Sequence, residues 1–323
     1  MIASKLLDFI VCPRDKSTLR ESAQQLICEQ GHTYGVVDGV PVLLLEGEEV
    51  AFTHCDAQRA LIATRTDSPN LMPAPKDGEI DAWVSKWIAA TNGGLYQHLE
   101  GKLQEYPIPN LRLPPGNGRL FLEVGCSWGR WCVAAARAGY RPVGVDPSLG
   151  GVRAARHVAH QLGIDALFVV GDGRYLPFRD ATFDQAFSYS VLQHLSKDNV
   201  RITLREVHRV LRSGSDSLIQ MANKLGPRSI YHQLRHLVVK TRGFEVRYWL
   251  PGELLSAFNE ILGPSTLEVD GYFSLNPQIS DIRFMPARYR VVVHTSEALR
   301  KVSHTLTPLH YVADSLYVRT KKL

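Results

Sequence analysis

The regular alternation of two kinds of segment after residue 119 most constrains how this chain can fold. Short apolar runs that suit strands alternate there with longer runs that suit helices. Strands are expected at 120–124, 142–145, 167–170, 184–189 and 217–221, and helices near 130–138, 149–162 and 198–210. This alternation favours βαβ units, in which parallel strands form one sheet that helices cover. The sequence therefore predicts an α/β fold for this region.

A glycine-containing turn, Leu122–Trp131 (LEVGCSWGRW), joins the first of these strands to its helix. Such a turn lets backbone approach a ligand, and the helix N-terminus offers free N–H groups. The dinucleotide fingerprint needs glycines at its first, third and sixth positions. Gly125, Ser127 and Arg130 occupy these positions, so that fingerprint fails twice. The looser GxGxG loop of enzymes that bind S-adenosylmethionine (SAM) fits better, with Gly129 as its third member.

Three carboxylates stand where successive strands are expected to end. Glu123 precedes the glycine turn, Asp146 ends VGVD, and Asp172 ends VVGD. Asp146 is placed to accept hydrogen bonds from ribose hydroxyls. Asp172 is placed to accept one from an adenine amino group, and Gly173 leaves room for the ring. The alternative for these residues is helix capping and turn chemistry.

The stretch 120–221 resembles class I SAM-dependent methyltransferases of the type seen in ubiquinone biosynthesis. The resemblance is carried by LEVGCSWG, VGVDPS, GDGRYLPFRDATFDQAFSYSVLQHL and RVLRSGSDSLI. It implies a Rossmann-like, seven-stranded sheet whose last strand is antiparallel, with SAM as cofactor. Ser127 and Ser215 depart from the family's glycines. The candidate cofactor-binding residues are Tyr96, Glu123, Gly125, Ser127, Gly129, Asp146, Asp172, Gly173 and Ser190.

Two of the candidates concern the reacting end of the cofactor. His194, in SVLQHL, follows the fourth strand at the carboxyl edge, where open α/β sheets bind ligands. It is the candidate catalytic base, and the alternative is a histidine that caps or packs the following helix. Tyr96, in TNGGLYQHL, is expected to close over the methionine end of SAM, with core packing as its alternative.

The N-terminus carries a candidate metal site. Cys12, Asp15, Cys28 and His32 read C-x2-D-x12-C-x3-H, a zinc-ribbon layout in which the aspartate stands where a second cysteine is usual. The phrase YGVVDGVPVLL resembles the ending of small zinc-ribbon subunits that activate tRNA and protein methyltransferases. Similar ribbons are fused in front of a ribosomal RNA guanine methyltransferase domain. A structural zinc ion is therefore expected, and the alternative is a ribbon that has lost its metal.

The positive charge of the chain is concentrated locally. The net charge is +5, and 221–250 holds six Lys and Arg residues against the single acid Glu245. Such a cluster favours an anionic neighbour, with a solvated helix face as the alternative. Arg228 and Arg235, seven apart, are the candidate residues for recognising an anionic substrate.

The expected organisation is a zinc-ribbon-like β-rich domain at 1–48, a helical linker or cap at 49–118, and a methyltransferase domain at 119–323. A substrate lid is expected at about 274–313. No apolar run approaches the ~20 residues that span a bilayer. The N-terminus lacks a signal-peptide pattern, and five cysteines do not make a disulfide framework, so a cytoplasmic protein without a membrane span is expected.

These patterns predict a SAM-dependent methyltransferase that acts on a small-molecule or glycan acceptor, in which the basic cluster would recognise an anionic group. One alternative is an RNA methyltransferase whose ribbon and basic segment grip nucleic acid. The other is a catalytically silent SAM-binding or activator protein, an interpretation that Ser127 supports and the three strand-end acids oppose. The sequence does not specify the acceptor, the methylated atom or the oligomeric state.

Overall fold

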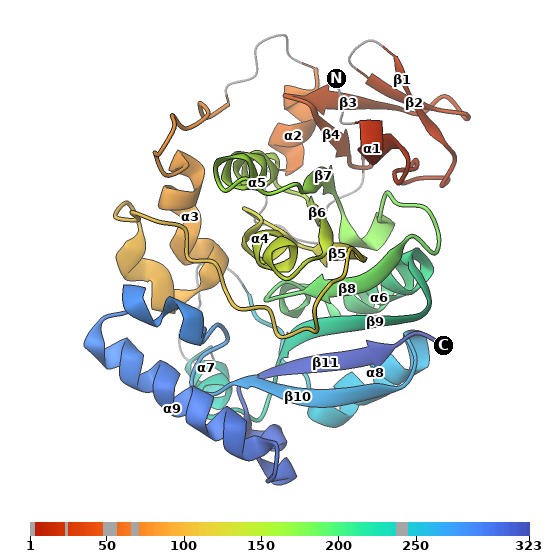
Figure 1. The fold of residues 1–323 in the computed structure, drawn as a ribbon. Helices are drawn as coiled ribbons and strands as arrows, with labels where there is room; N and C mark the ends of the chain where they lie inside the picture. Colours follow the sequence, from red (N-terminus) through yellow and green to blue (C-terminus); the bar gives the residue numbers. More distant parts are fainter. Residues whose placement is uncertain (1–3, 23–24, 48–56, 66–70, 237–244) are drawn as a thin grey trace.

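The computed structural model describes residues 4–22, 25–47, 57–65, 71–236 and 245–323 (Figure 1). Parts of the predicted linker (48–56 and 66–70) and of the basic segment (237–244) lie outside these residues. Within the described chain, eleven strands join in one sheet, in the order β1-β2-β3-β4-β7-β6-β5-β8-β9-β11-β10. No described helix has the length and apolar character needed to cross a bilayer.

The core of the sheet contains seven strands, as the resemblance to SAM-dependent methyltransferases implies. Their bounds are β5 Leu120–Val124, β6 Arg141–Asp146, β7 Leu167–Gly171, β8 Phe183–Ser188, β9 Leu211–Ala222, β10 Ser265–Gly271 and β11 Ser315–Lys321. The first five run parallel, whereas β11 lies antiparallel between β9 and β10. The predicted Rossmann-like methyltransferase sheet with an antiparallel last strand is confirmed.

The N-terminal β-rich region is continuous with this sheet. Its strands are β1 Leu19–Ser22, β2 Gln25–Cys28, β3 Thr33–Val37 and β4 Val40–Leu43. The first three connections are antiparallel, but β4 pairs in parallel with β7, placing Val42 opposite Val170 and Leu43 opposite Gly171. The ribbon therefore covers the edge of β7, whose backbone groups would otherwise lack partners.

Helices cover both faces of the core sheet (Figure 1). The helices of the described residues are α1 Ser4–Leu7, α2 Ala57–Ala63, α3 Ala82–Asn92, α4 Arg130–Arg137, α5 Leu149–Gln161, α6 Lys197–Val210, α7 Pro227–His236, α8 Pro251–Ile261 and α9 Ala287–Ser303. The short 3₁₀ turns are η1 Gly94–Leu99, η2 Gly173–Tyr175, η3 Leu192–His194, η4 Ile279–Phe284 and η5 Thr307–Val312. Within β5, Phe121 packs with Trp131 of α4, while Leu122 packs in the cluster that contains Leu204 of α6. Alternate residues are thus buried on opposite faces, as expected for a central parallel strand.

The segment before the core and the insertion at 274–313 pack against each other. Val84 and Ile88 of α3, Tyr96 of η1 and Met285 after η4 share one buried cluster. This contact fixes α3 beside the carboxyl ends of the parallel strands, where the site lies (Figure 1).

Candidate functional site

The turn after β5 has the backbone conformation of a glycine loop. Gly125, Ser127 and Gly129 all have positive φ angles, of 81°, 48° and 75°. A Cβ atom on Gly125 would lie 2.3 Å from the side chain of Val191, so glycine is required there. Ser127 adopts the left-handed conformation that the family's glycine would take, at a cost in backbone strain.

Asp146, at the end of β6, holds this turn in place. Its carboxylate accepts hydrogen bonds from the backbone N–H of Ser127 and of Ser148, each at 2.9 Å. Ser148 also caps α5 by accepting a hydrogen bond from Gly151 N. The carboxylate therefore lies between the glycine turn and the N-terminus of α5, a position suited to a ribose.

A cavity of about 1120 Å3 opens beside this turn. Five predicted site residues line it: Gly125, Ser127, Asp146, Ser190 and His194. The lining also includes Trp83, Lys86 and Trp87 of α3, which the sequence analysis assigned only to the helical linker or cap at 49–118. The aromatic character of Trp83 and Trp87 was the available signal. The docking of α3 depends, however, on contacts between residues that are far apart in the sequence.

Glu123 lies beneath the turn and does not line the cavity. Its side chain is 1% exposed, and Oε2 has no hydrogen-bond partner. Burial raises the pKa of this carboxyl to about 8. The hydroxyl of Ser127 is likewise buried without a partner. The turn therefore carries two buried polar atoms without a hydrogen-bond partner.

The other predicted cofactor residues do not line the cavity. Asp172 caps η2 and forms an ion pair of 2.9 Å with Arg174. A Cβ on Gly173 would contact Thr203 and Val124, while Gly129 begins α4. Their contacts with a nucleoside stay predictions.

Tyr96 belongs to a buried polar cluster. Arg130 donates to Asp281 Oδ2 and to Asn92 Oδ1, both at 2.7 Å, and the hydroxyl of Tyr96 donates to the same Asp281 oxygen. These four side chains are buried and join α3, η1, α4 and η4. Tyr96 therefore packs in the core behind the cavity, which matches the alternative given for it above, and its contact with SAM stays a prediction.

His194 lies at the cavity wall on η3. Its Nδ1 is 2.8 Å from the carbonyl of Glu245, and because a carbonyl only accepts, this nitrogen is the donor. Arg247 holds the backbone of η3 in place. Its backbone N–H donates to the carbonyl of Gln193, and its guanidinium donates to the carbonyl of His194. The segment after α7 thus orients the candidate base.

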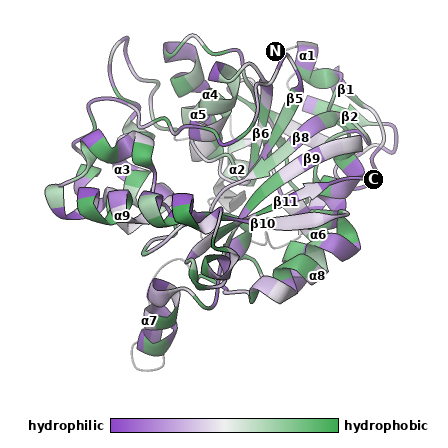
Figure 2. Cartoon of the chain, turned by 60° about the horizontal axis from the view of Figure 1, so that its bottom comes forward, coloured by the Kyte–Doolittle hydropathy of each residue, from purple (hydrophilic) through white to green (hydrophobic). Residues whose placement is uncertain are grey.

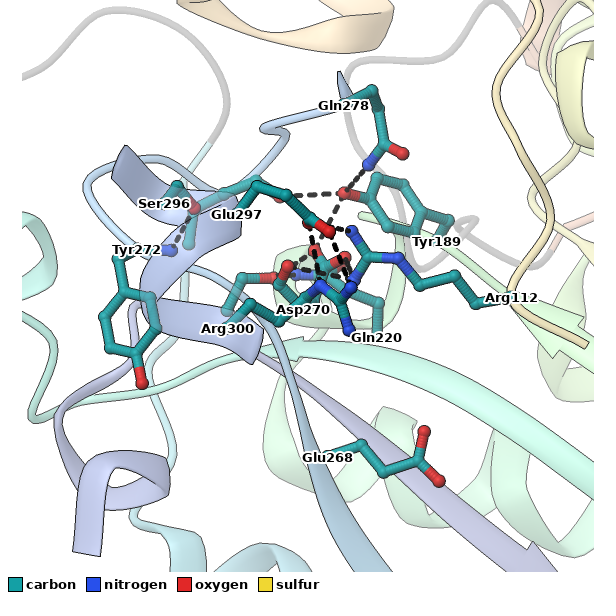
Figure 3. A network of polar contacts seen from close by, with 12 residues as sticks. Arg112, Tyr189, Gln220, Glu268, Asp270, Tyr272, Gln278, Ser296, Glu297 and Arg300 are labelled. Carbon is teal, nitrogen blue, oxygen red and sulfur yellow. Dashed lines mark hydrogen bonds and ion pairs between the residues drawn. The ribbon is translucent and has the colours of Figure 1, made fainter. Parts of the chain in front are cut away.

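Tyr189 connects the cavity to a buried network that the sequence analysis did not select (Figure 3). Its hydroxyl donates to Asp270 Oδ2 at 2.8 Å and accepts from Gln278 Nε2 at 2.7 Å. Burial raises the pKa of Asp270, and the guanidinium of Arg112, 3.1 Å away, opposes that rise. The network therefore fixes the hydroxyl end of the tyrosine at the cavity wall.

Arg228 and Arg235 lie elsewhere. Both are exposed on α7 and neither lines the cavity. The structure does not bring these two candidates to the site, because α7 projects away from the fold (Figure 2).

The four predicted metal ligands come together in the N-terminal ribbon. One ligand atom from each of Cys12, Asp15, Cys28 and His32 lies within 4.8 Å of the others. His32 Nδ1 is 3.6 Å from Cys12 Sγ, 3.4 Å from Cys28 Sγ and 2.8 Å from Asp15 Oδ2. Ligands of a tetrahedral zinc ion at about 2.0–2.3 Å are separated by roughly 3.3–3.8 Å.

The donor set also fits zinc chemically. Two thiols, one imidazole and one carboxylate are accepted zinc ligands. Hydrogen bonds from the side chain and backbone of Ser17 lower the pKa of Asp15, which keeps this ligand ionised. The cluster is therefore consistent with the structural zinc that the sequence predicts.

Comparison with known proteins identifies the core. A family model described as a methyltransferase domain matches residues 121–214. The chain carries a class I SAM-dependent methyltransferase domain. An uncharacterized methyltransferase of Synechocystis sp. is 29% identical to it over 133 residues, which are 41% of this chain and 58% of that protein. The chain thus spans less than two thirds of this relative.

Two further proteins are similar to parts of the chain. A UPF0434 protein of Vesicomyosocius okutanii is 45% identical over 47 residues, which are 14% of this chain and 80% of that protein. Through these residues the chain belongs to the UPF0434 family, consistent with its zinc-ribbon-like N-terminus. The crystal structure of a SAM-dependent methyltransferase from Methanosarcina mazei is similar over 66% of this chain and 100% of its own, with 17% identity and a TM-score of 0.48.

Proposed function

We propose that this protein transfers a methyl group from SAM to a small-molecule or glycan acceptor. The observation that carries the proposal is the single cavity shared by the glycine turn and α3. Its volume of about 1120 Å3 exceeds the roughly 300–1,000 Å3 typical of a site for one drug-sized ligand. Cofactor and acceptor can therefore occupy it together.

The residues on the turn side would hold the cofactor. Asp146 would accept hydrogen bonds from the ribose hydroxyls, Gly125 permits close approach of the backbone, and Ser127 lines the cavity beside them. When bound, SAM supplies the methyl group on its sulfonium. The protein's part is to align the acceptor in line with that group and to exclude water.

His194 would remove the acceptor proton. An oxygen or nitrogen nucleophile loses a proton as the carbon bond forms, and Nε2 holds the lone pair that can take it. The hydrogen bond from Nδ1 to the carbonyl of Glu245 stabilises the imidazolium that results. This assignment rests on the position of the ring at the cavity wall and on the fixed tautomer.

The acceptor side of the cavity is aromatic and carries a cation. Trp83 and Trp87 have ring centroids 6.5 Å apart, and Lys86 Nζ lies 5.3 Å from the Trp87 ring. Indole rings suit the apolar face of a sugar or a planar ring, and the ammonium suits an anionic substituent. Lys86 therefore takes the role that the sequence analysis gave to Arg228 and Arg235.

The test uses methyl-labelled SAM and cell extract separated into small-molecule, glycan, protein and RNA fractions. Label is expected in a small-molecule or glycan fraction, insensitive to ribonuclease. His194→Gln should abolish the transfer while SAM affinity, measured by calorimetry, stays within about twofold. Label in RNA would favour the nucleic-acid alternative, and SAM binding without any label would favour a silent protein.

A further inference from the structure

Helix α7 exposes both apolar and basic side chains, and it projects from the fold (Figure 2). Ile230, Tyr231 and Leu234 are 44%, 59% and 60% exposed, and of the helix's residues only Ser229 is buried. Residues 224–244 carry five Lys and Arg and no Asp or Glu. Isolated exposed apolar residues are common, but a cluster on a projecting helix indicates a contact surface.

The arrangement around the helix separates the two kinds of side chain. At about 100° per residue, Ile230, Tyr231 and Leu234 fall within one arc of roughly 100°. Arg228 and Arg235 fall on the adjacent side, within about 20° of each other. The side opposite the apolar arc contains the buried Ser229 and faces the fold.

The base of the helix is held firmly while the rest projects (Figure 2). Asp314, fully buried, accepts a hydrogen bond of 2.8 Å from Ser229 N at the helix N-terminus. The same carboxylate accepts a bond of 2.6 Å from Phe273 N, and a Cβ on Gly226 would collide with it. The exposed face is therefore presented in a fixed orientation.

We propose that α7 docks the protein on the headgroup region of an anionic lipid bilayer. Interfacial helices combine an apolar face that enters the acyl boundary with adjacent Lys and Arg that contact anionic headgroups. Tyrosine suits that boundary, and arginine can extend its charged end to the surface.

The pattern of charged and apolar residues on α7 favours an anionic bilayer over two alternatives, a second copy of the chain and nucleic acid. A second copy of the chain would bring the same positive segment against Arg228 and Arg235, and like charges repel. Nucleic acid would match the positive charge, but Ile230 and Leu234 contribute nothing to phosphate binding. An anionic membrane satisfies both features at once.

The test is sedimentation of the full-length protein with vesicles. We expect binding to phosphatidylcholine containing about 30% phosphatidylglycerol, weak binding to phosphatidylcholine alone, and weakening by added salt. Arg228→Gln with Arg235→Gln should lower the partition coefficient about 30-fold. Ile230→Ser with Leu234→Ser should lower it about tenfold or more.

The matched control is Val291→Ser with Leu306→Ser, two exposed apolar residues outside α7, which should bind vesicles like the wild type. All substituted side chains are exposed, and circular dichroism checks that each variant folds. Failure of the wild type to bind anionic vesicles would overturn the proposal, as would undiminished binding by the α7 variants. Lipid-free dimerisation lost in Ile230→Ser with Leu234→Ser would assign the face to self-association instead.

Discussion

Replacing Glu123 by glutamine should remove a pH-dependent loss of stability. Glu123 is buried at the end of β5, and burial raises its pKa to about 8 from an ordinary value of 4.5. Between these two pH values the folded protein binds a proton that the unfolded chain has released. The free energy of unfolding must therefore fall as pH rises through this window, and the fall ends near pH 8.

The raised pKa sets the size of the effect. A rise from 4.5 to about 8 corresponds to at most about 5 kcal/mol, at roughly 1.36 kcal/mol per pH unit. Because neighbouring groups and water relax around a buried charge, we expect about 2–4 kcal/mol. Glutamine has nearly the same shape and does not titrate, so the variant should lack this component.

Urea denaturation at several pH values between about 5 and 8 measures the effect directly. The free energy of unfolding of the wild type should decline relative to that of Glu123→Gln across the whole range. Glu260→Gln is the control, because Glu260 is exposed and pairs only at the surface with Arg201. If wild type and Glu123→Gln follow parallel curves, the carboxyl is ionised in the folded protein and the argument from burial is wrong.

Four further outcomes are expected. Asp146→Asn should weaken SAM binding tenfold or more by calorimetry, at roughly 1.5–3 kcal/mol for charge-assisted hydrogen bonds; unchanged affinity would remove Asp146 from the site. The purified wild type should hold about one zinc by mass spectrometry, and Cys28→Ser should lose it and melt at lower temperature; a metal-free, fully folded wild type would contradict this. Ser127→Gly should stabilise the protein by about 0.5–1 kcal/mol in urea, since it relieves a positive φ; destabilisation would refute the strain. Asp281→Asn should cost about 3–5 kcal/mol in urea because it leaves Arg130 buried and unpaired; a near-neutral effect would mean that the pair is not desolvated.

The strands of the core were predictable because each has a local signal. β5 begins and ends where the sequence places it, β6 is longer than the expected range by one residue at each end, and β7 is longer by one residue at its C-terminal end. The pairing of β4 with β7 was not predictable, because the register between Val42 and Val170 joins segments about 130 residues apart and no local pattern encodes it. β1 has no local signal, because its sequence, LRES, lacks apolar alternation.

The same distinction, between local signals and contacts distant in sequence, explains which site residues were predictable. Gly125 and Asp146 line the cavity because they end adjacent parallel strands, which the chain order alone implies. The position of Trp87 depends on how α3 docks, which involves Asp281 and other residues nearly 200 positions away. Asp172 was predicted to bind the nucleoside, but its carboxylate forms an ion pair with Arg174, two residues further along the chain. The sequence motif does not reveal this ion pair.

The shared sheet makes the ribbon part of the folding unit of the core. Val11, next to the first metal ligand, donates its backbone N–H to the carbonyl of Pro177 at 3.0 Å. Lys16, one residue after the second ligand, pairs with Glu206 of α6 at 2.9 Å. Ordering of the residues around Cys12 and Asp15 by the metal would therefore also order their contacts with the segment after β7 and with α6. Since β4 covers the edge of β7 as well, loss of the metal should also loosen the carboxyl end of β7, which Asp172 follows.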